Sequence, residues 1–343
     1  MTVNTDQLKR QVLLHKQIPI INCLRGVAAS MVCFFHFVTT TTGYVKSEDV
    51  KYLFSFGNTG VYMFFVISGV VIPLSLIKNG YNYNNLHNFM LKRLARLEPP
   101  YLFCIVLALV YFQVRKLVPT SAATDLTPEL QDLLLHIGYL VPFFNARWVL
   151  EVFWTLGIEF QYYLIISLTL PLVTRIKTAR FVFYGLFLVA PYILPHASFF
   201  HLYAPIFLIG IMYTLHITDL VGVWEYFIVT VLAGIASLFI LPVSFTIVAL
   251  LTIVIIYHLP NSKTPTLLFL GKISYSLYLL HTITGAAFIN LMSHRFTHPY
   301  QKPIVIVLGF GLSVVCAYIF FKLIEQPSLR LSSRIKLKNK LYK

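Results

Sequence analysis

Long apolar stretches, separated by short polar connections, follow one another along the whole chain. A helix of about 20 apolar residues crosses the hydrocarbon core of a bilayer, so each stretch is a candidate membrane span. Three of the stretches are short, and any count from eight to eleven fits the pattern. The pattern predicts an all-α fold, a polytopic transmembrane helix bundle of about ten spans. These spans are expected at 20–41, 57–77, 99–118, 152–173, 181–195, 199–216, 223–241, 243–259, 266–291 and 303–324.

Composition supports this prediction and limits which kinds of partner the protein can bind. The chain is 58% hydrophobic and 11% charged, with a mean hydropathy of +0.77, which excludes a soluble globular protein. A net charge of +15 is typical of proteins that bind nucleic acid. However, with the N-terminus in the cytoplasm, 20 of the 27 Lys and Arg residues fall on the cytoplasmic side. We therefore expect a multi-pass protein of the inner (plasma) membrane with both termini cytoplasmic, in contact with membrane lipid and with no nucleic-acid partner.

No linker or change of composition divides the chain, so residues 1–343 are expected to form a single membrane domain. A cytoplasmic segment (1–18) would precede the first span, which lacks a following cleavage site and is expected to be retained. The basic cytoplasmic tail (327–343) is expected to lie on anionic headgroups. The four cysteines lie in or beside spans without zinc-ligand spacing, which argues against a metal site or a disulfide.

Two connections are long enough to form structure of their own. Residues 79–98 end in a basic amphipathic pattern that predicts a helix at the cytoplasmic interface, where it would anchor the protein to anionic lipid. Residues 119–151 contain a helix start at 127–129 and an apolar run at 133–144 that is too short to span, which predicts a re-entrant or interfacial segment. This segment would either cover an acceptor site as a lid or pack against the bundle.

The first span carries two ionisable residues, Arg25 and His36, 11 residues apart. At about 100° per residue they share one helix face, to within roughly 20°, and lie about 16 Å apart along the axis. Ionisable groups inside a membrane are costly and usually serve a function. Imidazole titrates near neutrality, so His36 is a candidate general base for a hydroxyl group.

Arg93 and Arg96 lie three residues apart just before the third span. Their forked guanidinium groups match phosphate oxygens, so we consider them, with Arg25, as candidates for binding a nucleotide-bearing substrate. The alternative is simple anchoring by positive charge at the cytoplasmic face.

Three further residues have both a functional and a structural interpretation. Glu159, in the fourth span, would orient a histidine or bind an acceptor, or it would be a hydrogen-bond partner of Tyr162 or Tyr163. His281 forms a polar stripe with Ser274 and Tyr278 on the ninth span. This stripe would either form hydrogen bonds between helices or line one wall of a hydrated cavity. Glu325 ends the last span and is expected to be a surface carboxylate, although pairing with the arginines is an alternative.

The predicted depths of these residues indicate a function. Arginines lie at the cytoplasmic mouth, histidines at middle depth and a carboxylate toward the outside. This order suits a reaction across a membrane, in which a charged donor binds from the cytoplasm and a nucleophile is deprotonated in a shielded cavity. A proton-coupled transporter or flippase for a lipid-linked sugar or small anion would also use buried histidines, as proton relays.

Six motifs resemble the acyltransferase 3 family of integral membrane O-acyltransferases, over nearly the whole chain. They are Arg25-Gly26 with His36 ten residues later, FGNTGVYMFFVISGVVI in the second span, RLARLEPPY before the third, WTLGIEFQYY in the fourth, GKISYSLYLLH in the ninth and IEQP at the end. The family often has Trp-Ser-Leu and a second acidic residue in the fourth of these motifs, where this chain has Thr155 and Phe160.

The resemblance implies ten spans and O-acetylation of a surface polysaccharide or other exported glycan, with acyl-CoA, usually acetyl-CoA, as the cytoplasmic co-substrate and no metal. It implies functional roles for the Arg25/His36 and Arg93/Arg96 pairs. We therefore expect Arg25, Arg93 and Arg96 to hold the CoA phosphates, and His36 to act as general base or acyl carrier. Glu159 and His281 would line the cavity and orient its groups. The transfer would be completed by this domain alone or with an extracytoplasmic partner protein.

Overall fold

The computed structural model describes residues 18–41, 43–117, 128–144, 146–193 and 199–337, and every regular element in these ranges is a helix. All ten predicted spans coincide with helical segments, which confirms the predicted helical membrane bundle. The longer helices are α2 (Pro19–Phe35), α4 (Gly60–Lys78), α5 (Leu86–Lys116), α7 (Trp154–Arg175), α8 (Lys177–Ile193), α9 (Ala204–Ile217), α10 (Val223–Leu238), α11 (Val243–His258) and α15 (Gln301–Phe320). The shorter ones are α3 (Glu48–Ser55), α6 (Leu130–Leu135), α12 (Pro265–Lys272), α13 (Ser274–Leu280), α14 (Ala287–Met292) and α16 (Gln326–Arg334).

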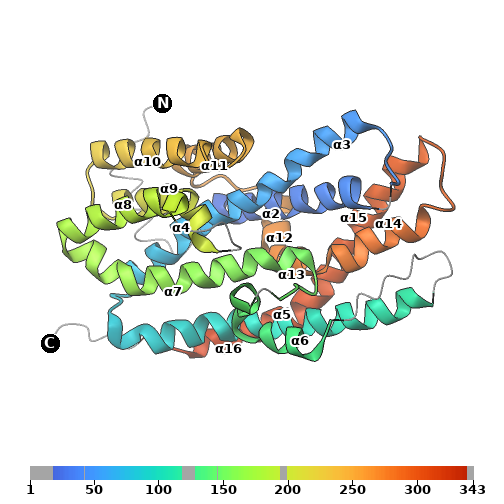
Figure 1. Cartoon of the computed structure of the whole chain (residues 1–343), viewed down its shortest axis with the longest axis horizontal. Coiled ribbons are helices and arrows are strands. Elements are labelled where there is room, and N and C mark those ends of the chain that lie inside the picture. Colours follow the sequence, from blue (N-terminus) through green and yellow to red (C-terminus); the bar gives the residue numbers. More distant parts are fainter. Residues whose placement is uncertain (1–17, 42, 118–127, 145, 194–198, 338–343) are drawn as a thin grey trace.

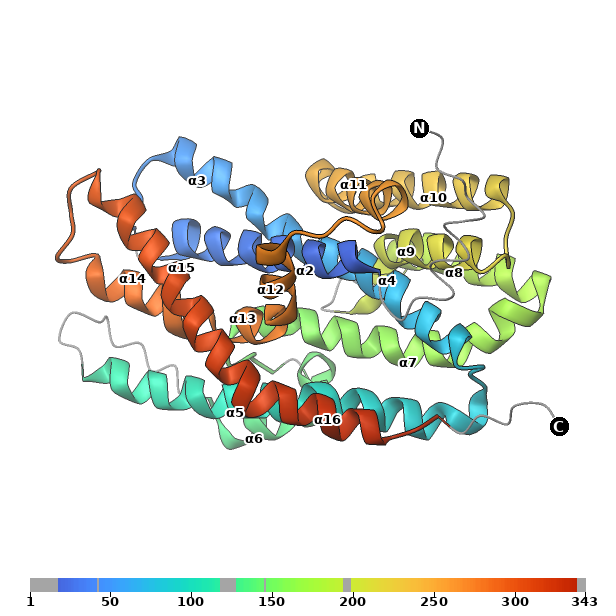
Figure 2. The ribbon, with the colours of Figure 1, turned by 180° about the vertical axis from the view of Figure 1, so that it is seen from behind.

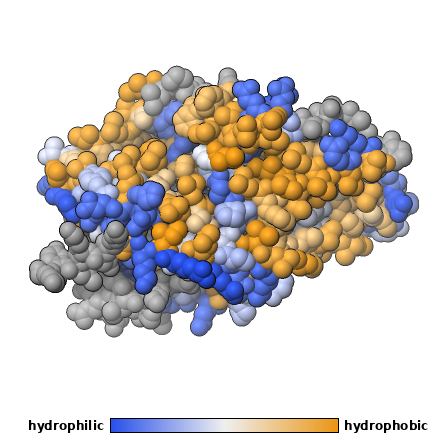
Figure 3. Space-filling view, turned by 90° about the horizontal axis from the view of Figure 1, so that it is seen from below, coloured by the Kyte–Doolittle hydropathy of each residue, from blue (hydrophilic) through white to orange (hydrophobic). Residues whose placement is uncertain are grey.

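By length and composition, six helical stretches within the described residues are long and apolar enough to cross a membrane. They are Pro19–Thr40, Glu48–Lys78, Tyr83–Lys116, Glu151–Arg175, Phe200–Ile217 and Gln301–Arg334. The ninth predicted span is instead a broken one, since α12, α13 and α14 are consecutive short helices. Hydrophobic side chains cover broad areas of the surface in Figure 3, as expected for helices that face lipid.

Helices α2, α4 and α7 lie at the centre of the bundle (Figure 1). Helices α8 to α11 pack on one side of them, and α5 and α16 lie side by side on the other, as the reverse view in Figure 2 also shows. Helix α12 crosses α2 at a pair of glycines. A Cβ atom on Gly271 would collide with the Asn22 carbonyl, and one on Gly26 would collide with the Leu267 carbonyl. Because small residues let two helices approach closely, this crossing brings α13 and its histidine against α2.

The structure corrects one predicted boundary and defines one predicted segment. The amphipathic stretch before the third span is not a separate interfacial helix, because α5 runs without a break from Leu86 through Pro99 and Pro100 to Lys116. The apolar run at 133–144 does form structure of its own, a series of short helical turns that follow α6. These turns pack inward, with His136 and Tyr139 buried against Tyr101 of α5.

Candidate functional site

Three cavities lie in series along the centre of the described bundle. We call them the vestibule, about 870 Å³, the arginine cavity, about 100 Å³, and the histidine cavity, about 200 Å³. Their order can be read along the helices that line them. On α2 and η1 (His36–Thr40), the residues from Ile18 to Arg25 line the vestibule, Arg25 also lines the arginine cavity, and Val32 to His36 line the histidine cavity.

Adjacent cavities share wall residues. Arg25, Val71 and Arg96 line both the vestibule and the arginine cavity. Val61 and Tyr278 line both the arginine cavity and the histidine cavity. The three cavities are therefore neighbours, and these side chains form the walls between them.

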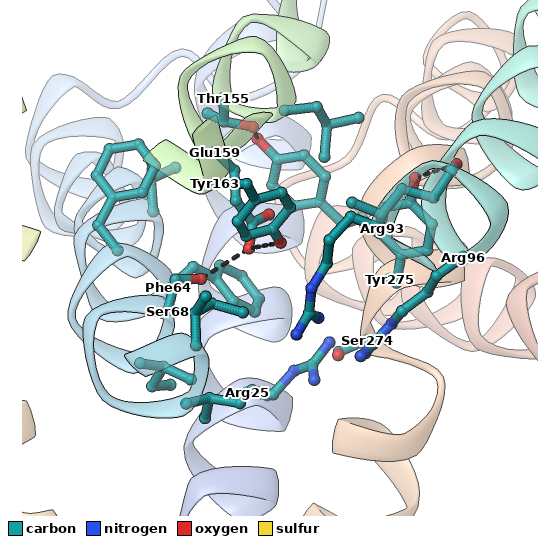
Figure 4. A pocket seen from close by; sticks show the side chains of 18 residues that line it. Arg25, Phe64, Ser68, Arg93, Arg96, Thr155, Glu159, Tyr163, Ser274 and Tyr275 are labelled. Atoms are coloured by element: carbon teal, nitrogen blue, oxygen red, sulfur yellow. Dashed lines mark hydrogen bonds between the residues drawn. The ribbon is translucent and has the colours of Figure 1, made fainter. Parts of the chain in front are cut away.

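The arginine cavity brings together three of the residues singled out in the sequence. Arg25 comes from α2, and Arg93 and Arg96 come from successive turns of α5. Figure 4 shows the three guanidinium groups turned toward the same space. None of them forms an ion pair within 4.0 Å with a carboxylate of the described residues, so a strongly positive potential remains in a small, partly enclosed volume.

Arg93 is held in place by aromatic rings. It is only 8% exposed, and its guanidinium carbon lies 5.2 Å from the ring centre of Phe89 and 5.4 Å from that of Tyr163. These cation–π contacts fix the plane of the group. Its buried Nε has no hydrogen-bond partner in the described part of the protein. A buried cation with an unsatisfied donor destabilises the protein unless a ligand accepts the missing hydrogen bond. An anion would accept this bond and also neutralise the charge.

Glu159 lines the same cavity but touches neither histidine. Its Oε1 accepts hydrogen bonds from the Ser68 hydroxyl at 2.7 Å and from the Tyr163 hydroxyl at 2.5 Å. Tyr163 was one of the two partners considered from the sequence. The other, Tyr162, leaves its hydroxyl without a partner among the described residues. Two donors on one oxygen orient the carboxylate, and the cavity lined by the arginines lies beside it (Figure 4).

Glu325 is not the surface carboxylate expected from its place at the end of a span. It is 4% exposed, and its Oε2 accepts hydrogen bonds from the backbone N–H and the hydroxyl of Ser276 at 3.2 and 2.5 Å. The carboxylate is turned inward because α13 packs beside α15, the helix that precedes Glu325, and supplies these donors. There it lines the vestibule with Arg25 and Arg96, where it offsets part of their charge without an ion pair.

His36 and His281 form a direct pair, although 245 positions separate them in the chain. His36 Nδ1 lies 2.9 Å from the Val32 carbonyl and 3.1 Å from His281 Nε2, and His281 Nδ1 lies 2.7 Å from the Tyr278 carbonyl. A carbonyl oxygen only accepts, so each neutral ring carries its proton on Nδ1. His36 Nδ1–H is then shared between Val32 and His281, and its Nε2 keeps a free lone pair.

His36 lines the histidine cavity, whereas His281 is fully buried and lines none of the three cavities. The free Nε2 of His36 is therefore the nitrogen available to a molecule in that cavity, and His281 acts on it only through His36. Of the two histidines, only His36 is placed to take a proton from a bound hydroxyl.

Three π-helical turns occur at these ionisable residues. His36 begins η1, His281 precedes η8 (Thr282–Ala286), and Glu325 ends η9 (Phe321–Glu325). A π-turn adds a residue to the helical repeat, re-aims the side chains beside it and is common at functional sites. Helical periodicity does not predict these turns from the sequence.

The structure also brings in residues that the sequence analysis did not single out. Ser68 contacts Glu159, and Asn58 and Glu151 line the histidine cavity with His36. Ser68 stands out in the sequence only as a lone polar residue in an apolar run. Glu151 is an acidic residue at the very start of a span, which the sequence analysis passed over. Groups of three or more metal-ligating side chains do not occur in the described residues.

The chain was compared with models of known protein families. A family model described as an acyltransferase domain matches residues 18–322, which is nearly the whole chain. No curated protein and no solved structure matches.

Proposed function

This chain belongs to the acyltransferase domain family, and on that premise we propose that it is an O-acetyltransferase of the inner membrane. It would take an acetyl group from acetyl-CoA on the cytoplasmic side and transfer it to a hydroxyl of an exported or surface glycan. One observation carries the proposal. Along one series of cavities, three arginines without an ion pair to any described carboxylate lie toward one end, and His36, whose Nε2 faces the cavity, lies at the other.

The arginine cavity and the vestibule suit the donor. The phosphates of CoA need several forked cationic donors, and Arg25, Arg93 and Arg96 provide them. The vestibule has room for the nucleotide part, and Lys78 and Lys272 also line it. From there the thioester arm would extend past Val61 and Tyr278 toward His36.

The histidine cavity suits the chemistry. An acceptor hydroxyl hydrogen-bonded to His36 Nε2 would lose its proton to that nitrogen as its oxygen attacks the thioester carbonyl. The carbon–sulfur bond then breaks, and the imidazolium returns the proton to the departing thiolate, which leaves as free CoA. His281 would stabilise the transient positive charge, since its Nε2 accepts the His36 Nδ1–H bond. In the covalent variant, His36 Nε2 attacks the thioester carbonyl and the carbon–sulfur bond breaks, which releases CoA. The acceptor hydroxyl then attacks the acetyl group on the imidazole, the carbon–nitrogen bond breaks, and the proton of the hydroxyl passes to the freed Nε2.

The proposal can be tested with full-length protein in lipid nanodiscs. We expect release of free CoA from acetyl-CoA, and a weaker interaction with donor in R93Q and R96Q. R295Q, which removes an exposed arginine away from the cavities, is the matched control. Radiolabelled acetyl groups that remain on His36 in the absence of acceptor would favour the covalent variant.

Mass spectrometry of surface glycans would test the acceptor class. Cells without the gene should lose about 42 mass units per modified site, the mass change of one acetyl group. Absence of CoA release, with movement of a sugar or anion across the membrane instead, would favour the transporter alternative.

A further inference from the structure

The histidine cavity differs in charge from the arginine cavity. Its polar lining includes His36, Asn58 and Glu151, and no Lys or Arg of the described residues lines it. Three guanidinium groups line the arginine cavity, but a single carboxylate provides the formal charge of this one. The two cavities therefore favour ligands of opposite charge.

Glu151 is free to act on a ligand. It lies in η6 (Glu151–Phe153), the turn that leads into α7, and its side chain is exposed. No cation of the described residues forms an ion pair with it. It is also close enough to His36 for an electrostatic interaction between the two groups. An unpaired carboxylate beside the reacting nitrogen will repel any second anion that enters.

The walls of this cavity are largely aromatic. Tyr62 stacks on Phe245 with ring centres 4.1 Å apart, and Phe35 meets His36 edge-on at 4.8 Å. Trp154, which lines the cavity, is buttressed by Tyr203 at 5.4 Å. Flat aromatic faces beside a few hydrogen-bonding groups suit a molecule with apolar C–H faces and a rim of hydroxyls, which describes a sugar ring.

We propose that Glu151 determines acceptor specificity, so that the histidine cavity accepts sugar residues without negative charge near the reacting hydroxyl and rejects uronic acids and phosphorylated or sulfated sugars. This inference rests on the proposed function and refines its acceptor. Glu151 would accept a hydrogen bond from a hydroxyl next to the one that reacts. A carboxylate or phosphate in the same position would face Glu151 without a compensating cation.

The charge of the cavity can be measured without any acyl transfer. A cysteine in place of Asn58, which lines the cavity and is half-buried, would be labelled with a cationic and an anionic methanethiosulfonate reagent of similar size. At pH 8 an ordinary imidazole is neutral, so Glu151 supplies the charge. If the charge is taken to lie about 7 Å away in water-like surroundings, it changes each rate by about 2.7-fold in opposite directions, which gives a ratio of the two rates of about sevenfold.

After division by the rates for a free thiol, we expect the cationic reagent to react about sevenfold faster in N58C. The ratio should fall toward one in N58C/E151Q and stay unchanged in N58C/E48Q, because Glu48 is an exposed carboxylate on α3 that does not line the cavity. F35C offers a second labelling position if N58C does not fold. Equal rates for the two reagents, or a ratio that E151Q does not change, would overturn the proposal.

A matched pair of acceptors tests the consequence for transfer. Methyl xyloside and methyl glucuronide carry the same ring hydroxyls, and the glucuronide adds a carboxylate at C5. We expect the neutral sugar to be acetylated with at least a tenfold higher kcat/KM, roughly the cost of placing two like charges together. E151Q should reduce this difference in kcat/KM between the two sugars, and E151K should make the charged sugar the better acceptor. Transfer to both sugars at equal rates would contradict the proposed specificity but not the proposed acyltransferase activity. If neither sugar is acetylated, the ratio of the two labelling rates in N58C still tests whether Glu151 gives the cavity its negative charge.

Discussion

His281 offers a sharp test of the histidine pair, because it touches the reacting group only through His36. The perturbation is H281L, which keeps a side chain in a fully buried site but removes the acceptor of the His36 Nδ1–H bond. H281Q is the conservative variant, since its amide oxygen can still accept that bond. The Val32 carbonyl remains in both variants and holds the ring in place.

The expected magnitude follows from the geometry. The 3.1 Å contact becomes charge-assisted when His36 takes up a proton, and a hydrogen bond to a charged group contributes about 1.5–3 kcal/mol. Since about 1.4 kcal/mol corresponds to a factor of ten in rate, H281L should lower kcat by about 10- to 100-fold. The KM for acetyl-CoA should stay unchanged, because His281 lines neither donor cavity.

The assay is steady-state release of CoA thiol from acetyl-CoA by nanodisc-embedded protein in the presence of acceptor. H281Q should recover most of the lost kcat. The double variant H36A/H281L should be no slower than H36A alone, because the effect of His281 passes through His36. A kcat for H281L within twofold of wild type, or a loss that falls entirely on the KM for acetyl-CoA, would refute the positioning role.

Three further predictions concern the donor site, the inward-packed segment and the helix crossing. R93Q should raise the KM for acetyl-CoA by about tenfold or more, from the loss of one charge-assisted contact; R93K should recover only part of this, because Lys lacks the fork that stacks on Phe89, and full recovery would argue against that geometry. Burial lowers the pKa of His136 below its ordinary value. The stability that neutral His136 gives to residues 130–150 should therefore be complete above the unfolded pKa of about 6.5 and lost as pH falls toward the lower native value, so hydrogen exchange in this segment should quicken at pH 5 in wild type but not in H136Q. G271V should destabilise the bundle by about 1–3 kcal/mol in a denaturant titration, whereas G185V, with no atom within 4 Å of its new Cβ, should not; equal effects would contradict the close crossing.

Local pattern was enough to predict the helices and part of the site. Apolar length predicted helical structure correctly in each of the ten stretches, and the 11-residue spacing placed Arg25 and His36 along one helical segment that lines successive cavities. The match of guanidinium groups to phosphate oxygens had grouped Arg93 and Arg96 with Arg25, and all three line the arginine cavity.

The remaining features depend on packing between distant segments. The contact of His36 with His281 arises because Gly26 and Gly271 let α12 approach α2, and no local pattern encodes that approach. Glu325 is an ordinary end-of-span carboxylate in the sequence, and its burial appears only once Ser276 supplies donors from another helix. The amphipathic stretch and the third span were predicted as separate elements. They form one continuous α5, because prolines inside a membrane helix, here Pro99 and Pro100, can be accommodated by its neighbours.

The central claim is that His36 takes the proton, or the acetyl group, during transfer from acetyl-CoA. It is tested most directly by acetyl transfer to acceptor in wild type and H36A, measured beside the binding of acetyl-CoA to each. We predict that H36A binds acetyl-CoA with wild-type affinity but transfers acetyl groups about 10²- to 10⁴-fold more slowly, the usual contribution of a general base. Full transfer activity in H36A would contradict the account.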